Sequence, residues 1–122
     1  MTKEEEKIIE EFLSEICAVF PEIKPLMDKH EDYLNTSKME EFANATTRAF
    51  GRTNKPERGK EYLEYMSKKL DRSKPIEAKF IDTYYVENLF WDSPKENVEV
   101  GWQYTPNNLK RLYVKFHGNE PL

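Results

Sequence analysis

Apolar residues recur at helical spacing along most of the chain, and the stretch Pro75–Trp91 is apolar over the widest arc. Two rows of large side chains run through it at intervals of four residues: Ile76, Phe80 and Tyr84 in one, and Ile81, Tyr85 and Leu89 in the other. At about 100° per residue, the two rows cover about half of the helix circumference. Such a helix must be covered on more than one side, so we predict that Pro75–Trp91, here named the hub helix, is central to a helical fold.

Helix caps and periodic apolar residues predict five further helices. Thr2 with Glu5, and Ser37 with Glu40, have the spacing of capping boxes, and prolines are well placed near several helix starts. Thr105 and Pro106 suit the N-cap and the first residue of the last helix. The predicted ranges are Thr2–Phe20, Pro25–Leu34, Ser37–Phe50, Pro56–Leu70 and Thr105–Gly118. The second of these helices is expected to bury Tyr33 in the core.

One segment departs from the helical pattern. Val98, Val100, Trp102 and Tyr104 alternate with small or polar residues, a period of two that predicts an extended segment over Val98–Tyr104. The fold class is therefore all-α, with residues 1–122 forming a single domain of about six helices in an antiparallel stack or bundle.

Composition bounds the class of protein without naming a chemistry. Charged residues make up 34% and the mean hydropathy is -0.88, but 13% aromatics are too many for a disordered chain. No apolar run approaches the roughly 20 residues of a membrane span, and the single Cys17 excludes an intramolecular disulfide. We expect a soluble cytoplasmic protein without membrane contact, as a monomer or a homodimer.

No catalytic, cofactor-binding or metal-binding motif is apparent. The two histidines stand in no metal-ligand spacing, and Cys17 falls beside the apolar stripe of the first helix. Glu87 and Asn88 lie close to the apolar arc of the hub helix, where buried polar groups need partners. We interpret them as structural anchors for the segment around Pro94–Pro106 or for a helix N-terminus. A catalytic Glu87 is the alternative.

Charge is unevenly distributed and defines two candidate binding surfaces. Residues 1–35 hold four Lys or Arg against ten Asp or Glu, a difference of -6, whereas residues 48–75 hold nine against four, a difference of +5. An acidic surface can cover a basic partner and speed association. Basic residues between aromatics can hold phosphates and stack on bases. The candidates are Glu4, Glu6, Glu10 and Glu11 on the acidic side, and Arg48, Arg52, Arg58, Lys69 and Arg72 on the basic side.

The chain resembles a family of small bacterial helical proteins of unknown function. The resemblance rests on Phe20-Pro21-Glu22, the Met39–Phe50 helix, the stretch Tyr85-Val86-Glu87-Asn88-Leu89 and the closing Phe116-His117-Gly118. The hub helix also resembles the inner helix of a HEAT-type hairpin, which implies a short right-handed stack. Members of the family are similar to the immunity proteins that accompany bacterial toxins.

These observations predict a binding protein and not an enzyme, with no cofactor and no metal. The leading hypothesis is an immunity-type protein that neutralises a bacterial toxin by binding it. One alternative is a nucleic-acid-associated or regulatory module that uses the basic Arg48–Lys74 stretch, although nucleic acid is the less favoured partner because the acidic part of the chain repels phosphates. The other is a small enzyme with Glu87 in a pocket.

Overall fold

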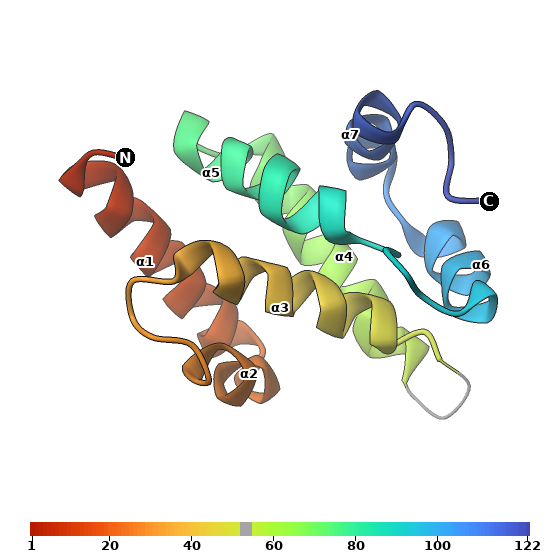
Figure 1. Cartoon of the computed structure of the whole chain (residues 1–122), viewed down its shortest axis with the longest axis horizontal. Helices are drawn as coiled ribbons and strands as arrows, with labels where there is room; N and C mark the ends of the chain where they lie inside the picture. The colour runs from red at the N-terminus through yellow and green to blue at the C-terminus, as the bar shows by residue number, and fades with distance from the viewer. Residues whose placement is uncertain (52–54) are drawn as a thin grey trace.

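The computed structural model describes residues 1–51 and 55–122, and these residues form helices and connecting turns without a strand (Figure 1). The all-α prediction is therefore confirmed, while the HEAT-type likeness stays a prediction. The helices are α1 (Lys3–Val19), α2 (Lys24–Asp28), α3 (Asn35–Arg48), α4 (Pro56–Asp71), α5 (Pro75–Phe80), α6 (Lys95–Tyr104) and α7 (Asn107–His117). A short 3-10 turn, Pro21–Ile23, precedes α2.

The predicted hub helix is one helical run with a change of winding inside it. After α5 the chain makes a π-helical turn over Ile81–Tyr85 and a 3-10 turn over Val86–Asn88. The π-turn explains the two apolar rows. Its wider winding places residues five apart on the same side, so the buried face passes from Ile76 and Phe80 in the first row to Ile81 and Tyr85 in the second. The run ends before Trp91, whose side chain is 70% exposed. The residues that it buries most completely are Phe80, Ile81, Tyr85, Val86 and Leu89.

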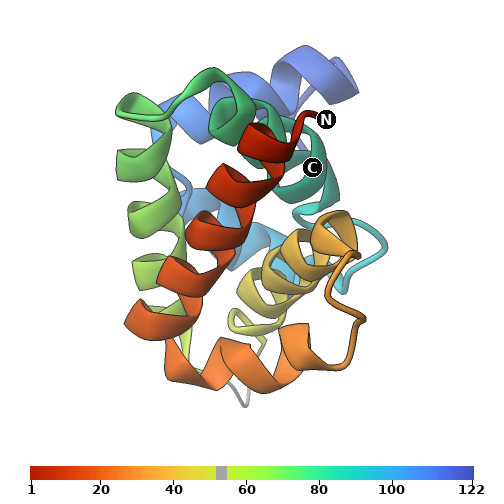
Figure 2. The ribbon, with the colours of Figure 1, turned by 90° about the vertical axis from the view of Figure 1, so that its left-hand side faces the viewer.

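Helix α3 shares the centre of the molecule with the hub run. Figure 1 shows the two lying side by side, and Figure 2 shows α1 at the front of the molecule, with α3 to its right, α2 at the bottom and α4 at the left. Met39, Phe42 and Ala43 on α3 are fully buried, and they belong to a single apolar cluster with the buried residues of α1, α4 and the hub run.

The segment predicted to be extended is helix α6, so that prediction was wrong. Its buried residues are Asn97, Val98, Gly101 and Trp102, which is the spacing of one helical face, whereas Tyr104 is exposed. The alternation misled because it grouped Gly101 with the polar positions Glu99 and Gln103. Gly101 in fact faces the core, where an added Cβ would lie 2.4 Å from the ring of Phe90 and 3.0 Å from that of Phe50.

Three local predictions also need correction. Tyr33 is 75% exposed, because α2 ends at Asp28 and the following residues form a surface turn. Helix α3 begins at Asn35 without a side-chain cap, so Ser37 lies inside its first turn. Thr105 ends α6 by donating its hydroxyl to the Gly101 carbonyl, and Pro106 takes the N-cap position of α7. The Thr2–Glu5 capping box of α1, by contrast, is confirmed.

Two buried threonines on α3 connect the elements of the second half of the chain. The Thr46 hydroxyl donates to the Phe42 carbonyl and lies 2.9 Å from the hydroxyl of the fully buried Tyr85. The Thr47 hydroxyl accepts the N–H of Phe90 at 3.0 Å, and the Thr47 carbonyl accepts the side-chain amide of Asn97 at 3.0 Å. The hub run, its exit turn and α6 are thus all bonded to one turn of α3.

We predict that Thr47→Val lowers the free energy of unfolding by about 1–3 kcal/mol, because the isosteric side chain leaves the buried Phe90 N–H without an acceptor. The measurement is urea unfolding followed by circular dichroism. Thr36→Val, the same change in the first turn of α3, is the matched control and should have a much smaller effect. Equal effects of the two substitutions would contradict the anchoring role of Thr47.

Candidate functional site

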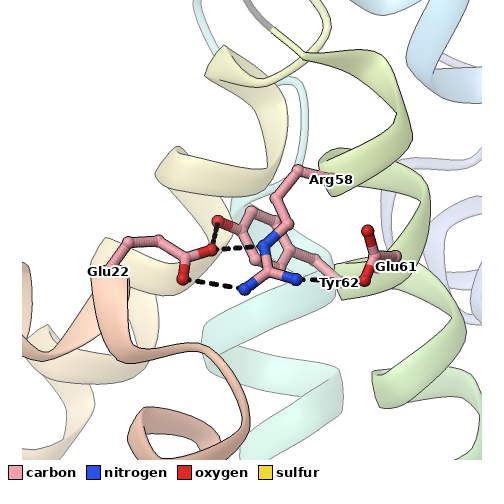
Figure 3. Close-up of polar contacts among 4 residues, drawn as sticks. All are labelled: Glu22, Arg58, Glu61 and Tyr62. Carbon is pink, nitrogen blue, oxygen red and sulfur yellow. Dashed lines mark hydrogen bonds and ion pairs between the residues drawn. The ribbon is translucent and has the colours of Figure 1, made fainter.

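A cluster of four polar side chains joins the turn after α1 to helix α4 (Figure 3). Arg58 binds both carboxylate oxygens of Glu22, through Nε at 2.5 Å and Nη2 at 2.8 Å. Tyr62 donates its hydroxyl to the same carboxylate at 2.5 Å, and Glu61 accepts from Arg58 Nη1 at 3.0 Å. The guanidinium also lies 4.7 Å from the centre of the Phe20 ring. This geometry fixes two elements that are distant in sequence.

The electrostatics of this cluster suit a clamp and not a catalyst. Hydrogen bonds from Arg58 and, to a lesser degree, from Tyr62 lower the pKa of Glu22 from 4.5 to about 2. Burial and the bond to Glu22 raise the pKa of Tyr62, so its hydroxyl stays protonated. Glu22 therefore remains an acceptor across the physiological range, and neither group is poised to exchange protons near neutral pH.

A second ionic cluster is nearly buried between α1, α4 and α5. The Lys69 ammonium lies 3.1 Å from Glu77 and 3.7 Å from Glu15, and 5.0 Å from the centre of the Phe12 ring. The side chains of Lys69 and Glu77 are only 13% and 8% exposed. Glu77 also accepts the N–H of Lys74 at the start of α5. Every charged group here has a partner, as a buried ionic cluster requires.

The four acidic candidates are all exposed on α1. Glu6 and Glu10 are four residues apart and share one side of the helix, while Glu4 and Glu11 are seven apart and share another. Lys3 and Lys7 fall between the two pairs, at about 100° per residue. These four glutamates are named the acidic surface below.

The basic candidates do not form one free surface. Arg58 and Lys69 serve the two ionic clusters described above. Arg48 and Arg72 are exposed near the ends of α3 and α4. Arg52 lies outside the described residues. Two of the four described cations are therefore committed to holding the fold together.

Glu87 and Asn88 lie apart from the contacts that anchor α6. Asn88 donates its amide to the Tyr84 carbonyl within its own helical turn at 3.0 Å. Glu87 is half-buried, and burial followed by the nearby Asp82 raises its pKa. The anchoring that we assigned to these two residues is carried by Thr47 and Asn97. Sequence reasoning missed Asn97 because it lies in the stretch predicted to be extended.

The sequence also did not reveal a groove of about 540 Å³ between α1, α2 and the start of α3. Its floor contains Leu13, Cys17 and Met27, and the two sulfur atoms lie 3.6 Å apart. Burial, and then the charge of Asp28, raises the pKa of Cys17, so the thiol remains neutral. A pocket of this size suits a small molecule or a single side chain. No local motif signals it, because its walls come from three elements.

Residues 1–51 and 55–122 have neither a metal-ion cluster nor a membrane-spanning helix. That part of the chain contains no group of three or more His, Cys, Asp or Glu residues arranged to hold a metal ion. It also contains no helix with the length and apolar character needed to cross a membrane.

The fold and its clusters define a small all-helical domain in which ion pairs hold helices together and carboxylates project from α1. The chain belongs to a family defined by a domain of unknown function, DUF7674, whose model matches residues 13–119. The predicted membership of an uncharacterised family is thus confirmed. No curated protein and no solved structure matches the chain.

We predict that stability falls in acid partly through Glu22. Its pKa is lower in the folded chain than the ordinary 4.5, so its contribution is complete above that pH and is lost as the pH falls toward about 2. The side chain is 42% exposed, so solvent screening limits this contribution to about 1 kcal/mol. Urea unfolding at about pH 6 and about pH 3 should show a smaller acid loss in Glu22→Gln than in the parent. Glu57→Gln, on α4, is the control and should keep the full acid loss.

A further prediction concerns the buried pair. Lys69→Met should destabilise the protein by about 3–5 kcal/mol, because it leaves the Glu77 carboxylate buried without its cation. Adding Glu77→Gln should recover most of that loss, since the amide keeps the bond to Lys74 without a charge. Urea unfolding of the two variants measures both effects. A loss below about 1 kcal/mol for Lys69→Met would mean that the pair is solvated like an ordinary surface ion pair.

Proposed function

We propose that this protein binds another protein through the acidic surface of α1, as an immunity-type inhibitor of a basic bacterial toxin. The observation that carries the proposal is the contrast between the two sets of charged candidates. Glu4, Glu6, Glu10 and Glu11 are all exposed on one helix, whereas Arg58 and Lys69 are held in ion pairs within the molecule. The toxin as the class of partner rests on the family resemblance, and its basic character rests on these carboxylates.

Carboxylates in this arrangement act mainly on the rate of encounter. The four exposed glutamates outnumber Lys3 and Lys7 between them, and a surface of net negative charge attracts a basic partner over distances set by the ionic strength. Immobilising them costs side-chain entropy, so their contribution to the final affinity is smaller. An inhibitor that must reach a toxin before the toxin acts benefits from this kind of steering.

The two alternatives have less support. A nucleic-acid surface on the basic stretch would need free cations, and Arg58 and Lys69 are bound to carboxylates. A catalytic Glu87 would need a cleft and a second reactive group, and Glu87 lies outside both the groove beside α1 and a second cleft whose lining includes Glu22 and Arg58.

We predict that changing all four glutamates of the acidic surface to lysine abolishes protection when this protein is co-expressed with the basic toxin that it is proposed to neutralise. Protein level and helical circular dichroism should be unchanged, because exposed positions of this kind seldom affect stability. In binding kinetics, the association rate should fall more than the dissociation rate rises.

The matched control applies the same change in net charge elsewhere on the surface, at the exposed residues Glu57, Glu64, Glu99 and Glu120. It should protect as well as the parent. If the control variant fails equally, net charge and not the acidic surface is responsible. If protection instead disappears with Lys55, Lys68 and Arg72 changed to glutamate, the acidic-surface proposal is wrong and the basic alternative gains support.

A further inference from the structure

The groove between α1, α2 and α3 contains a polar atom without a partner. Asn35 lines the groove from the first turn of α3, and its side chain is almost fully enclosed, with the residue 6% exposed. Its Oδ1 is buried and accepts no hydrogen bond within the described residues. Most buried acceptors in folded proteins are satisfied, so this one calls for a donor from a water or from a bound group, and the groove beside it has room for either.

The charges around the groove indicate the sign of the missing group. Three carboxylates line it, from Glu10, Asp28 and Asp32, together with the ammonium groups of Lys24 and Lys38. Lys24 and Asp28 form an ion pair at 2.8 Å. Two carboxylates then remain for one cation, so a single added positive charge would balance the groove.

We infer that this groove binds an alkyl-guanidinium group, whose N–H donor Asn35 Oδ1 accepts once the side-chain amide turns toward the groove, with Asp32 and Glu10 balancing the charge. A guanidinium offers five donors in one plane, which suits acceptors from several elements. The floor of Leu13, Met27 and the neutral Cys17 thiol suits the methylene stem that carries the group.

The group has two sources, an arginine side chain of a protein partner or a free small guanidine. Glu10 belongs both to the groove and to the acidic surface, so an arginine anchored here would sit at the edge of the proposed interface. For a protein source the inference rests on the proposed function, whereas binding of the group itself does not. Arginines buried in such pockets are frequent contributors to interface affinity.

The test is nuclear magnetic resonance titration of the 15N-labelled full chain with arginine blocked at both ends. Blocked citrulline, its neutral isostere, is the control ligand. We expect saturable shifts at Cys17 and Asn35 with blocked arginine and much smaller ones with citrulline. Agmatine binding more weakly than blocked arginine would assign the group to a protein side chain, and the reverse order would assign it to a free guanidine. Absent shifts, or equal shifts with citrulline, would overturn the inference.

Two substitutions separate recognition from folding. Asn35→Leu should weaken binding about tenfold or more, while the urea midpoint of the free protein stays level or rises because an unsatisfied acceptor has been removed. Asp32→Asn should weaken binding about twofold to fivefold, and Asp92→Asn on a remote turn should have no effect. Binding that survives Asn35→Leu overturns the inference. If that variant does not fold, unchanged binding by Asp32→Asn does the same.

The outcomes also distinguish this inference from the proposed function. Loss of blocked-arginine binding in Asn35→Leu with intact protection would show a guanidinium site that the toxin does not use. Failure of blocked arginine to bind, with protection still dependent on the acidic surface, would overturn only the groove. A third outcome is that blocked arginine binds, but the variant with all four glutamates changed to lysine still protects. The groove would then be a site for a free guanidine, and the proposed function would be wrong.

Discussion

The docking of the hub run, its exit turn and α6 on α3 depends on the hydrogen bonds of Thr46 and Thr47. Both threonines are buried in the last turns of α3, and each also bonds to a carbonyl of its own helix. Through them the hub run, the exit turn at Phe90 and helix α6 all meet the same short segment. Burying these hydroxyls costs free energy unless every bond forms together, so the anchor makes the arrangement of these elements specific as well as stable.

The same packing decides which charged groups are free to act. With α3 and the hub run in place, α4 brings Arg58 against Glu22 and Lys69 against Glu77, and both cations become structural. Helix α1 buries its apolar stripe on this core and projects its glutamates outward. A net charge of -4 conceals this division, because an ion pair inside the fold and a free carboxylate on its surface contribute equally to the sum. Which charged side chains can meet a partner therefore depends on which ones the fold pairs or buries, and not on the net charge.

Periodicity predicted the elements that are governed by one wide apolar stripe. The centre of the hub run, the first helix and its capping box were identified in this way because each signal is local. The π-turn is visible in the sequence as two offset apolar rows, but helical periodicity alone assigns both rows to one wide arc of a regular helix. Helix α6 was missed because its identity depends on Gly101 admitting the rings of Phe90 and Phe50, which lie far from it in sequence or across a turn. The groove and the roles of Arg58 and Lys69 were missed for the same reason, since each depends on contacts between distant segments.

A buried hydrogen-bond acceptor without a partner is informative, because a single substitution to an apolar residue would remove it. A leucine at position 35 would fill similar space without the unmet acceptor, so Oδ1 itself adds nothing to the stability of the fold. By contrast, Thr46 and Thr47 are polar, buried and fully bonded, and the fold accounts for them completely. Asn35 is equally enclosed, yet its Oδ1 forms no bond within the described residues. The proposed guanidinium group would supply the donor that Oδ1 lacks, and the groove that Asn35 lines is where that group would enter.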